Sequence, residues 1–269
     1  MDKERYIESV REYKLLAKHE VGQNFLCSYE AASKIVGLAN IEQGDKILEI
    51  GPGAGSLSVF LTDYPNEADL VDIDEGLITK LKEDFKAHEN IHPVLANALK
   101  YDFTPYSIII GNLPYYITSS LIERILLEGK SCRKAVIMVQ KEAYSRLSSP
   151  IRTDGYGPLP ILLSYIGACK KAFSVSRDCF VPAPHVDSVV FTIDFRPDID
   201  FDYAKRFYAF LNAAFLHRRK TIYNNLQYYL KDGGKAGRII ADAGINKTAR
   251  PEALSLKEYL ALFEASQKR

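Results

Sequence analysis

The sequence predicts an α/β fold: a mainly parallel sheet covered by helices on both faces, followed by a small all-helical domain. Two observations predict it. Short apolar runs of β type alternate with amphipathic stretches over the first 195 residues, a pattern typical of βαβ units. Beyond Pro197 only helical periodicity remains, interrupted by glycines. We therefore expect one domain over residues 1–196, with an N-terminal helical extension, and a helical domain over residues 197–269.

The expected strands are runs of apolar and β-branched residues bounded by turn residues. In order they are Lys46–Ile50, Ala68–Ile73, Ile91–Leu95, Ser107–Gly111, Lys134–Gln140 and Ser188–Phe195. Amphipathic segments such as Gly76–Phe85 and Ser119–Leu127 separate them. Residues 148–158 combine Pro, Gly and Asp without periodicity and predict a long surface loop. The helices expected in the second domain are Tyr203–Phe215, Lys220–Leu230, Gly237–Ala243 and Leu256–Ala265, with Gly233, Gly234 and Gly244 as breaks.

The composition is that of a globular protein without a leader or a membrane segment. The first twenty residues alternate charges around no apolar core, which excludes a signal or transit peptide. No apolar run approaches the roughly 18 residues of a membrane span. The cysteines are far apart and form no C-x-x-C, so neither a metal site nor a disulfide framework is expected. We expect a cytoplasmic monomer that makes no membrane contact.

Charge is distributed unevenly along the chain. Residues 196–269 carry 14 Lys and Arg against 8 Asp and Glu, a net charge of +6. The preceding residues carry 21 against 26, a net charge of −5. A basic C-terminal quarter on an acidic remainder indicates a polyanionic partner, although solvated helix faces are often basic as well.

A glycine-rich loop follows the first strand, in E-I-G-P-G-A-G-S-L over residues 49–57. Closely spaced glycines between a strand and a helix let the backbone approach a ligand, and they can also form a simple tight turn. Gly51, Gly53 and Gly55 give G-x-G-x-G, whereas the dinucleotide fingerprint needs glycine at Ser56. No G-K-[ST] follows, which excludes a Walker A loop. An acidic residue at the end of the strand suits a ligand without phosphates, such as S-adenosylmethionine.

The second expected strand ends in L-V-D-I-D, which places Asp72 at the same edge of the sheet as the glycine loop. A carboxylate at this position can accept hydrogen bonds from both hydroxyls of a ribose. Ile73 beside it can cover one face of an adenine ring. Together with the loop, these residues predict a Rossmann-like, S-adenosylmethionine-dependent methyltransferase sheet.

Asn112 follows the fourth expected strand, in N-L-P-Y over residues 112–115. Asn offers an acceptor and a donor, Pro114 fixes the backbone and leaves the carbonyl of Leu113 free, and Tyr115 offers a ring for stacking. Two acceptors around the exocyclic amine of an adenine would aim its lone pair at a sulfonium methyl group. This arrangement favours N-methylation by in-line displacement, which needs no metal and no strong base. A plain turn is the alternative for the tetrapeptide alone.

With these motifs in order, the chain resembles the ribosomal RNA adenine dimethylase family, which includes the housekeeping KsgA-type enzymes and the macrolide-resistance, Erm-type methylases. The resemblance extends over nearly the whole chain. It rests on G-Q-N-F-L (22–26), E-I-G-P-G-A-G (49–55), N-L-P-Y (112–115), V-Q-K-E (139–142), Y-G-P-L (156–159), F-V-P-A-P-H-V-D-S (180–188) and R-R-K-T (218–221).

The resemblance implies S-adenosylmethionine as cofactor and a set of residues that bind it. Asn24 and Leu26 would close over it, Gly51 in the loop with Gly53 would contact its methionine part, and Asn97 would contact its adenine, beside Ile73. Asp72 would bind the ribose, and Asn112 would also contact the cofactor. Two of these positions depart from the family: Asn97 replaces the usual Asp, and Asp72 the usual Glu.

The resemblance also implies how the target adenine is held. Asn112 and the backbone around Pro114 would bind the amine, with Tyr115 on one face of the base and Phe180 on the other. Without the family, Phe180 before P-A-P indicates a rigid extended segment or a residue of the core. Tyr116 stands where the family usually has Asn, which would change the rim of the pocket.

Basic residues would contact the RNA backbone. Arg218, Arg219 and Lys220 begin an expected helix, and Arg152 and Lys141 are expected on the rim of the sheet. The adenine must be unstacked to reach such a pocket, so a loop or helix end in structured RNA is the expected substrate.

Three functions remain open. The leading one is dimethylation of two adjacent adenosines near the 3′ end of small-subunit (16S) ribosomal RNA, with a role in ribosome biogenesis; Gly22, Leu113 and the 180–188 motif favour it. The second is an Erm-type methylase of large-subunit (23S) RNA that confers macrolide resistance. The third is a ribosome-assembly factor that has lost catalysis, which the departures at Asp72, Asn97 and Tyr116 motivate.

Overall fold

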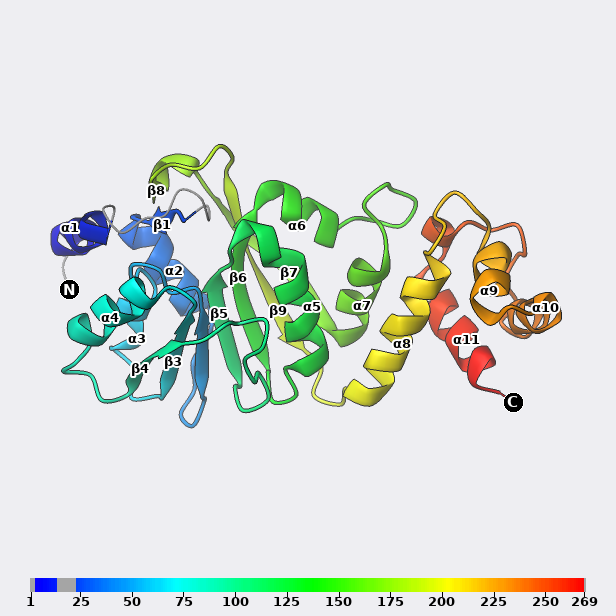
Figure 1. The fold of residues 1–269 in the computed structure, drawn as a ribbon, viewed down its shortest axis with the longest axis horizontal. Helices are drawn as coiled ribbons and strands as arrows, with labels where there is room; N and C mark the ends of the chain where they lie inside the picture. The colour runs from blue at the N-terminus through cyan, green and yellow to red at the C-terminus, as the bar shows by residue number, and fades with distance from the viewer. Residues whose placement is uncertain (1–2, 14–22, 269) are drawn as a thin grey trace. The chain divides into compact units, whose positions relative to one another are not determined.

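The computed structural model describes residues 3–13 and 23–268. Gly22 of the G-Q-N-F-L motif and part of the charged N-terminal stretch lie outside them. The chain divides into two compact units, each with its own core. The first comprises Met1–Tyr144 and Ala168–Pro197, and the second Ser145–Gly167 and Asp198–Arg269. The predicted α/β class with a helical C-terminal region is confirmed (Figure 1).

The first unit is built on a seven-stranded sheet of order β4-β3-β2-β5-β6-β9-β7. Its neighbours from β4 to β6 are parallel, and β9 runs antiparallel to β6. The strands are β2 (Ile47–Ile50), β3 (Ala68–Asp72), β4 (Ile91–Leu95), β5 (Ile108–Asn112), β6 (Lys134–Gln140), β7 (Gly167–Val175) and β9 (Ser188–Phe195). The helices are α1 (Lys3–Glu12), α2 (Tyr29–Leu38), α3 (Ser58–Leu61), α4 (Glu75–Asp84) and α5 (Thr118–Glu128). The chain passes from the first unit to the second within α6 (Lys141–Leu147).

The central strands are buried on both faces, which explains why they are nearly continuous apolar runs. In β2 and β5, Ile47, Leu48 and Ile108–Ile110 are all fully buried. Every expected strand is found to within one residue at each end. β7 is not predicted from the sequence, because it is an edge strand whose two lysines and exposed middle hide its pattern. The two-residue strands β1 (Phe25–Leu26) and β8 (Phe180–Val181), which pair with each other, are not predicted either.

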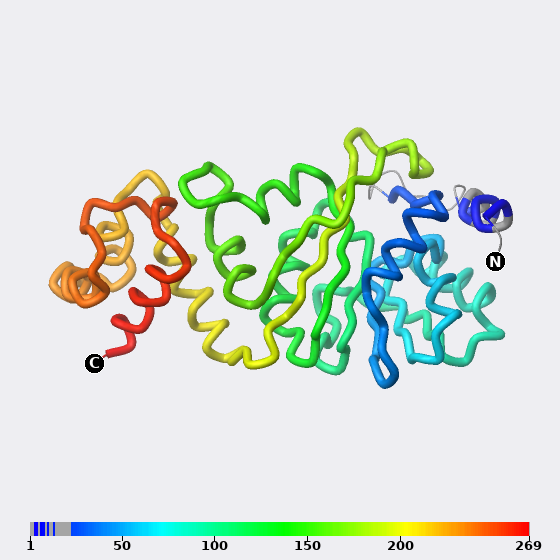
Figure 2. The backbone as a smooth tube through the Cα atoms, turned by 180° about the vertical axis from the view of Figure 1, so that it is seen from behind, coloured from blue at the N-terminus to red at the C-terminus, as the bar shows by residue number. Residues whose placement is uncertain are grey.

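The second unit is helical, with α7 (Pro158–Ile166), α8 (Phe201–Ala214), α9 (Ile222–Leu230), α10 (Gly233–Asp242) and α11 (Leu256–Gln267) around one core (Figure 2). Residues 145–167 were assigned to the first domain, but they belong to this unit. Tyr156 and Ile161 are buried in its core, and the Tyr156 hydroxyl donates to the Leu254 carbonyl at 2.9 Å. Gly233 and Gly234, expected as breaks, begin α10 after the Asp232 cap.

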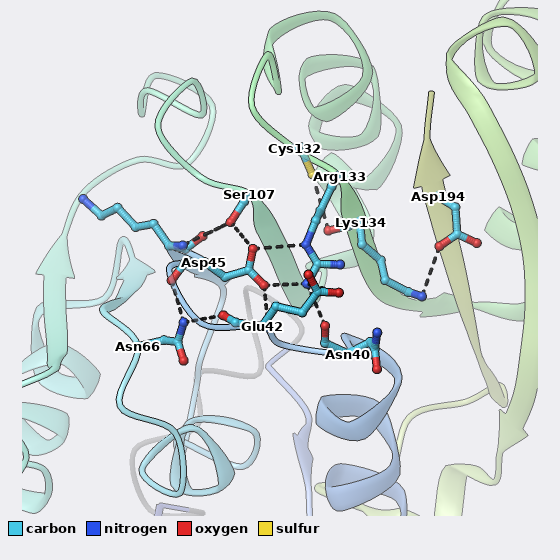
Figure 3. A network of polar contacts seen from close by, with 10 residues as sticks. Asn40, Glu42, Asp45, Asn66, Ser107, Cys132, Arg133, Lys134 and Asp194 are labelled. Atoms are coloured by element: carbon cyan, nitrogen blue, oxygen red, sulfur yellow. Dashed lines mark hydrogen bonds and ion pairs between the residues drawn. The ribbon is translucent and has the colours of Figure 1, made fainter. Parts of the chain in front are cut away.

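A polar network joins the amino ends of β2, β5 and β6 (Figure 3). The Asp45 carboxylate accepts hydrogen bonds from Arg133 Nε at 3.1 Å, from Arg133 Nη2, from Ser107 Oγ at 2.7 Å and from the Glu42 backbone N–H at 2.8 Å. Arg133 Nη2 also donates to the Asn40 carbonyl at 2.6 Å. Burial of Asp45 acts to raise its pKa, but these donors outweigh it and hold the pKa below its ordinary value.

Replacing Asp45 by alanine should lower the free energy of unfolding by about 1–3 kcal/mol, because it removes the acceptor shared by donors from three segments, of which Ser107 and Arg133 are partly buried. Since the native pKa is lowered, this stabilisation is present above the ordinary aspartate pKa and is lost as pH falls through the native value. Denaturant unfolding near pH 7 and between about pH 5 and 2 measures both effects.

The matched control is Glu83→Ala, which breaks an ion pair with Lys86 whose side chains are 67% and 69% exposed. This variant should unfold like wild type, because exposed pairs contribute little. Equal stability of Asp45→Ala and wild type near neutral pH would show that the network does not hold the strands.

Candidate active site

A cavity of about 210 Å³ opens at the carboxyl ends of β2, β3 and β5. The register pairs Ile50 with Val71 on one side and with Gly111 on the other, so the three strands end side by side. The cavity is lined by Gln23, Asn24, Phe25, Leu26, Glu49, Gly51, Pro52, Gly53, Ser56, Leu57, Asp72, Ile73, Asp74, Leu77, Asn112, Leu113, Pro114, Tyr115 and Tyr116. The structure therefore brings together the glycine loop, Asp72 and the N-L-P-Y segment, as the sequence predicts.

The glycine loop needs glycine for conformation and for space. Gly51 and Gly53 have φ angles of +69° and +56°, a region that side chains with a Cβ rarely adopt. A Cβ on Gly53 would lie 2.9 Å from the Phe25 ring, and one on Gly51 would lie 3.4 Å from the Asn112 carbonyl oxygen. The backbone of the loop thus forms a wall of the cavity that no larger residue could form.

Asp72 ends β3, which flanks β2 on the side away from β5, and Asp74 follows two residues later. The two carboxylates have different roles. Asp74 Oδ1 caps α4 by accepting from the Gly76 and Leu77 N–H groups at 2.9 and 3.3 Å. Asp72 Oδ1 accepts from the Asp74 N–H at 3.0 Å. Burial raises the pKa of Asp72 and the Asp74 charge adds to the effect, whereas backbone N–H groups oppose it. Ile73 beside it is 64% exposed.

Asn112 carries a buried acceptor that nothing in the described part of the chain satisfies. Its Nδ2 donates to the Asn24 carbonyl at 3.4 Å, but its Oδ1 is buried without a partner there. A buried unpaired carbonyl costs about 1–3 kcal/mol. Such groups are rare in native structures, so this one points to a hydrogen-bond donor that binds in the cavity.

Tyr115 and Tyr116 complete the wall next to Asn112. They begin a short 3-10 helix, Tyr115–Ile117, which Pro114 precedes. Tyr115 is half-buried, and burial raises the pKa of its hydroxyl. Tyr116 is 66% exposed at the cavity mouth.

Two predicted site residues lie elsewhere. Phe180 is 2% exposed, sits in the core of the first unit and does not line the cavity, so the structure supports the core interpretation and not a stacking face. Asn97 is also absent from the lining, and its Oδ1 accepts from the Leu99 N–H at 2.9 Å. Local sequence motifs do not determine how deeply an aromatic ring is packed or which turn an amide side chain caps. The positions of Phe180 and Asn97 therefore could not be predicted from them.

The predicted basic residues are divided between the units. Lys141 begins α6 directly after β6, at the carboxyl edge of the sheet. Arg152, which was expected on that rim, lies instead in the second unit, where its N–H donates to the Glu252 carbonyl at 2.8 Å. Arg218 Nη2 donates to the Thr153 carbonyl at 2.8 Å, whereas Arg219 and Lys220 are exposed before α9.

Glu49 is the acidic residue at the end of the first expected strand; it is not among the predicted cofactor-binding residues, yet it lies in the cavity wall. It is 1% exposed and its Oε2 accepts from Ser58 Oγ at 2.7 Å. Burial raises its pKa to about 8, the Asp72 charge adds to this, and the Ser58 bond opposes it. The signal in the sequence was an acidic residue inside an apolar strand. No group of three or more potential ligand side chains suitable for a metal occurs among the described residues.

Comparison with known proteins identifies relatives along nearly the whole chain. The family model for ribosomal RNA adenine dimethylase matches residues 15–268. The chain is 34% identical over 264 residues to ribosomal RNA small subunit methyltransferase A of Streptococcus sanguinis, covering 92% of this chain and 91% of that one. It is 33% identical over 266 residues to the protein of the same name from Malacoplasma penetrans, covering 97% and 96%.

Two solved structures are also similar to this chain. A dimethyladenosine transferase from Plasmodium falciparum is 25% identical, with a TM-score of 0.76 and coverage of 88% of this chain and 95% of that one. The 23S rRNA methyltransferase ErmE is also 25% identical, with a TM-score of 0.67 and coverage of 91% and 100%.

The raised pKa of Glu49 has a consequence for stability. Between the ordinary value of 4.5 and about 8, the native state keeps a proton that the unfolded chain has lost. The free energy of unfolding should therefore decrease as pH rises through this window, by roughly 1.4 kcal/mol for each pH unit at most. Glu49→Gln should remove most of this decrease and be the more stable protein near pH 8.

Denaturant unfolding of wild type, Glu49→Gln and the exposed control Glu89→Gln at several pH values checks this expectation. The control should follow wild type. Parallel stability curves for wild type and Glu49→Gln would show that Glu49 is ionised throughout the window.

Proposed function

This chain belongs to the ribosomal RNA adenine dimethylase family, and we propose that it methylates the N6 amines of two adjacent adenosines near the 3′ end of small-subunit ribosomal RNA. The methyl donor is S-adenosylmethionine. The single observation that carries the proposed mechanism is the buried Oδ1 of Asn112, an acceptor without a partner among the described residues, on the wall of a cavity that the glycine loop also lines.

The residues around the cavity fit S-adenosylmethionine, which supplies a methyl group on a positively charged sulfur. The open backbone at Gly51 and Gly53 would hold its methionine part, and the Asp72 carboxylate would accept from the ribose hydroxyls. The exposed Ile73 side chain would cover its adenine. Asn24 and Leu26 line the same cavity, in support of the closing role inferred for them. Asn97 would need to leave its turn to contribute.

Asn112 and Tyr115 would orient the target base. One amine N–H would donate to Asn112 Oδ1 and the other to a main-chain carbonyl beside Pro114, so the nitrogen lone pair would point away from both acceptors. The base would stack on the Tyr115 ring. The bound donor would supply the methyl group by in-line displacement with a neutral thioether as leaving group, while Asn112 and the carbonyl beside Pro114 would hold the amine in line. The methylated amine would then release its proton to solvent. Positioning supplies the catalysis.

Two features support RNA as partner. The second unit carries 15 Lys and Arg against 9 Asp and Glu, a net charge of +6. Arg219 and Lys220 are exposed and would contact phosphates, with Arg218 and Arg152 beside the Thr153 and Glu252 backbone in the same unit.

Among the described residues, none of the helices could cross a membrane. We place the reaction on small-subunit particles in the cytoplasm, with the enzyme as a monomer.

The test is transfer of labelled methyl groups from S-adenosylmethionine to unmodified small-subunit particles, large-subunit particles and protein-free large-subunit RNA, followed by mapping of the modified adenosines. Paired dimethyladenosines on the small subunit are expected. Label on large-subunit RNA alone would favour the second candidate, which the similarity to ErmE supports. Binding to the particles without any methyl transfer would favour the third function, a ribosome-assembly factor that has lost catalysis.

Asn112→Ala should reduce the rate constant of methyl transfer by about 100- to 1000-fold, because it removes the acceptor that orients the amine. Affinity for S-adenosylmethionine, measured by calorimetry, should change less than about tenfold, since most of its expected contacts lie on the loop and Asp72. The exposed Asn212→Ala variant is the control and should match wild type in both assays. Full activity of Asn112→Ala would refute the mechanism.

Gly51→Ala should weaken S-adenosylmethionine binding by about tenfold or more, because the added Cβ enters the cavity wall beside the Asn112 carbonyl. Gly244→Ala is a matched control, since Gly244 has a φ of +65° and no heavy atom lies within 4 Å of its would-be Cβ. Both variants should lose about 1–2 kcal/mol of stability from the strained backbone. Binding that is equally affected in both would show that strain, and not the cavity, is responsible.

A further inference from the structure

Tyr116 presents a large aromatic ring to solvent at the mouth of the cavity. The residue is 66% exposed although it lines the cavity, and its neighbours Leu113 and Thr118 are at most 3% exposed. Within the residues that the structure describes, its side chain forms neither a hydrogen bond nor a ring contact. The ring therefore has a free face at the point where a substrate must enter.

The backbone that carries Tyr116 is held on both sides. The Leu113 N–H donates to the Met138 carbonyl at 3.0 Å, which ties the segment to β6. The Pro114 carbonyl accepts from the Ile117 N–H at 3.3 Å and from Thr118 Oγ1 at 3.0 Å, which ties it to the start of α5. A tyrosine has two side-chain torsions, so ordering its ring on such a support costs little entropy.

The substrate of the proposed reaction creates a surface that such a ring fits. When one base is turned out of an RNA stack into a pocket, the adjacent base loses a stacking partner and exposes one face. Aromatic side chains stack on exposed base faces with little sequence preference. Because the proposed substrate contains two adjacent adenosines, the neighbour of the target is itself a purine with a large face.

We propose that Tyr116 is a stacking platform for the base next to the target adenosine, so that one adenine occupies the pocket while its neighbour rests on the Tyr116 ring. This inference rests on the proposed function. It assigns Tyr116 a positioning role, separate from the Tyr115 ring that faces the target base. Since the platform holds bound substrate before and during transfer alike, its loss should raise KM more than it lowers kcat.

Exposure alone does not distinguish Tyr116 from other tyrosines of the chain. Tyr228 and Tyr229 on α9 are 63% and 53% exposed, but Tyr228 packs against His217 with ring centroids 4.9 Å apart, and neither lines the cavity. The position of Tyr116 at the mouth distinguishes it. Tyr229→Ala is therefore a suitable control for the loss of an exposed tyrosine.

The test uses the full-length enzyme and small-subunit particles reconstituted with ribosomal RNA whose 3′ segment is ligated from a synthetic oligonucleotide. One substrate carries both adenosines, and two others carry an abasic site at one position or the other. Tyr116→Ala should raise KM for the intact substrate by about 5- to 100-fold, the range expected for one stacked base. Tyr116→Phe should retain the wild-type KM because it keeps the ring, and Tyr229→Ala should also retain it.

The decisive comparison is a double-mutant cycle. One abasic substrate should raise KM for wild type as much as Tyr116→Ala does, and the two changes together should give no further increase. Independent, multiplicative effects of the two changes would overturn the platform, as would a wild-type KM for Tyr116→Ala. If the wild-type enzyme fails to methylate the intact substrate, that result refutes the proposed function and, with it, the stacking role of Tyr116.

Discussion

The close approach between the carboxyl ends of β2 and β5 is the constraint on which the site depends. A Cβ on Gly111 would lie 2.5 Å from the Ile50 carbonyl oxygen, and one on Gly51 would lie 3.4 Å from that of Asn112. Glycine at both positions lets β5 pair with β2 while the loop turns back over Asn112. The Asp45 network joins the amino ends of the same strands (Figure 3). The register that places Asn112 beside the loop is therefore fixed at both edges of the sheet.

The cavity is electrostatically unfavourable to the protein alone. Glu49 and Asp72 are both drawn from water, and burial is the main cause of the raised pKa of each. The charge of Asp72 also raises the pKa of Glu49, so ionising both carboxyls is costly. A ligand with a positively charged sulfur would stabilise the ionised forms. The Oδ1 of Asn112, which has no partner in the part of the chain that the structure describes, adds a further unfavourable group. Strain and perturbed groups of this kind are common at functional sites.

The sequence was most informative where burial dictates composition. Strands such as β4, β6 and β9 were predicted to the residue, because turn residues bound their apolar runs. The edge strand β7 escaped detection because its exposed Lys170 and Lys171 break the pattern. Residues 145–167 were misassigned because order along the chain does not say which core an apolar helix such as α7 joins. The loop, Asp72 and Asn112 could be predicted to lie together because parallel strands end at one edge, whereas the burial of Phe180 depends on packing that no motif encodes.

The two units differ in net charge, and under the proposed function they would contribute differently to the binding of RNA. The unit that holds the cavity carries 20 Lys and Arg against 25 Asp and Glu, and its buried carboxyls face the donor site. Under the proposed function, this net negative charge would favour a cationic methyl donor and oppose phosphates, so affinity for RNA would come mainly from the basic second unit. What remains for the cavity mouth is recognition of an uncharged base. A hydrogen bond accepted by Asn112 and stacking on the aromatic faces of Tyr115 and Tyr116 would suit that task, because neither requires a positive charge beside the sulfonium.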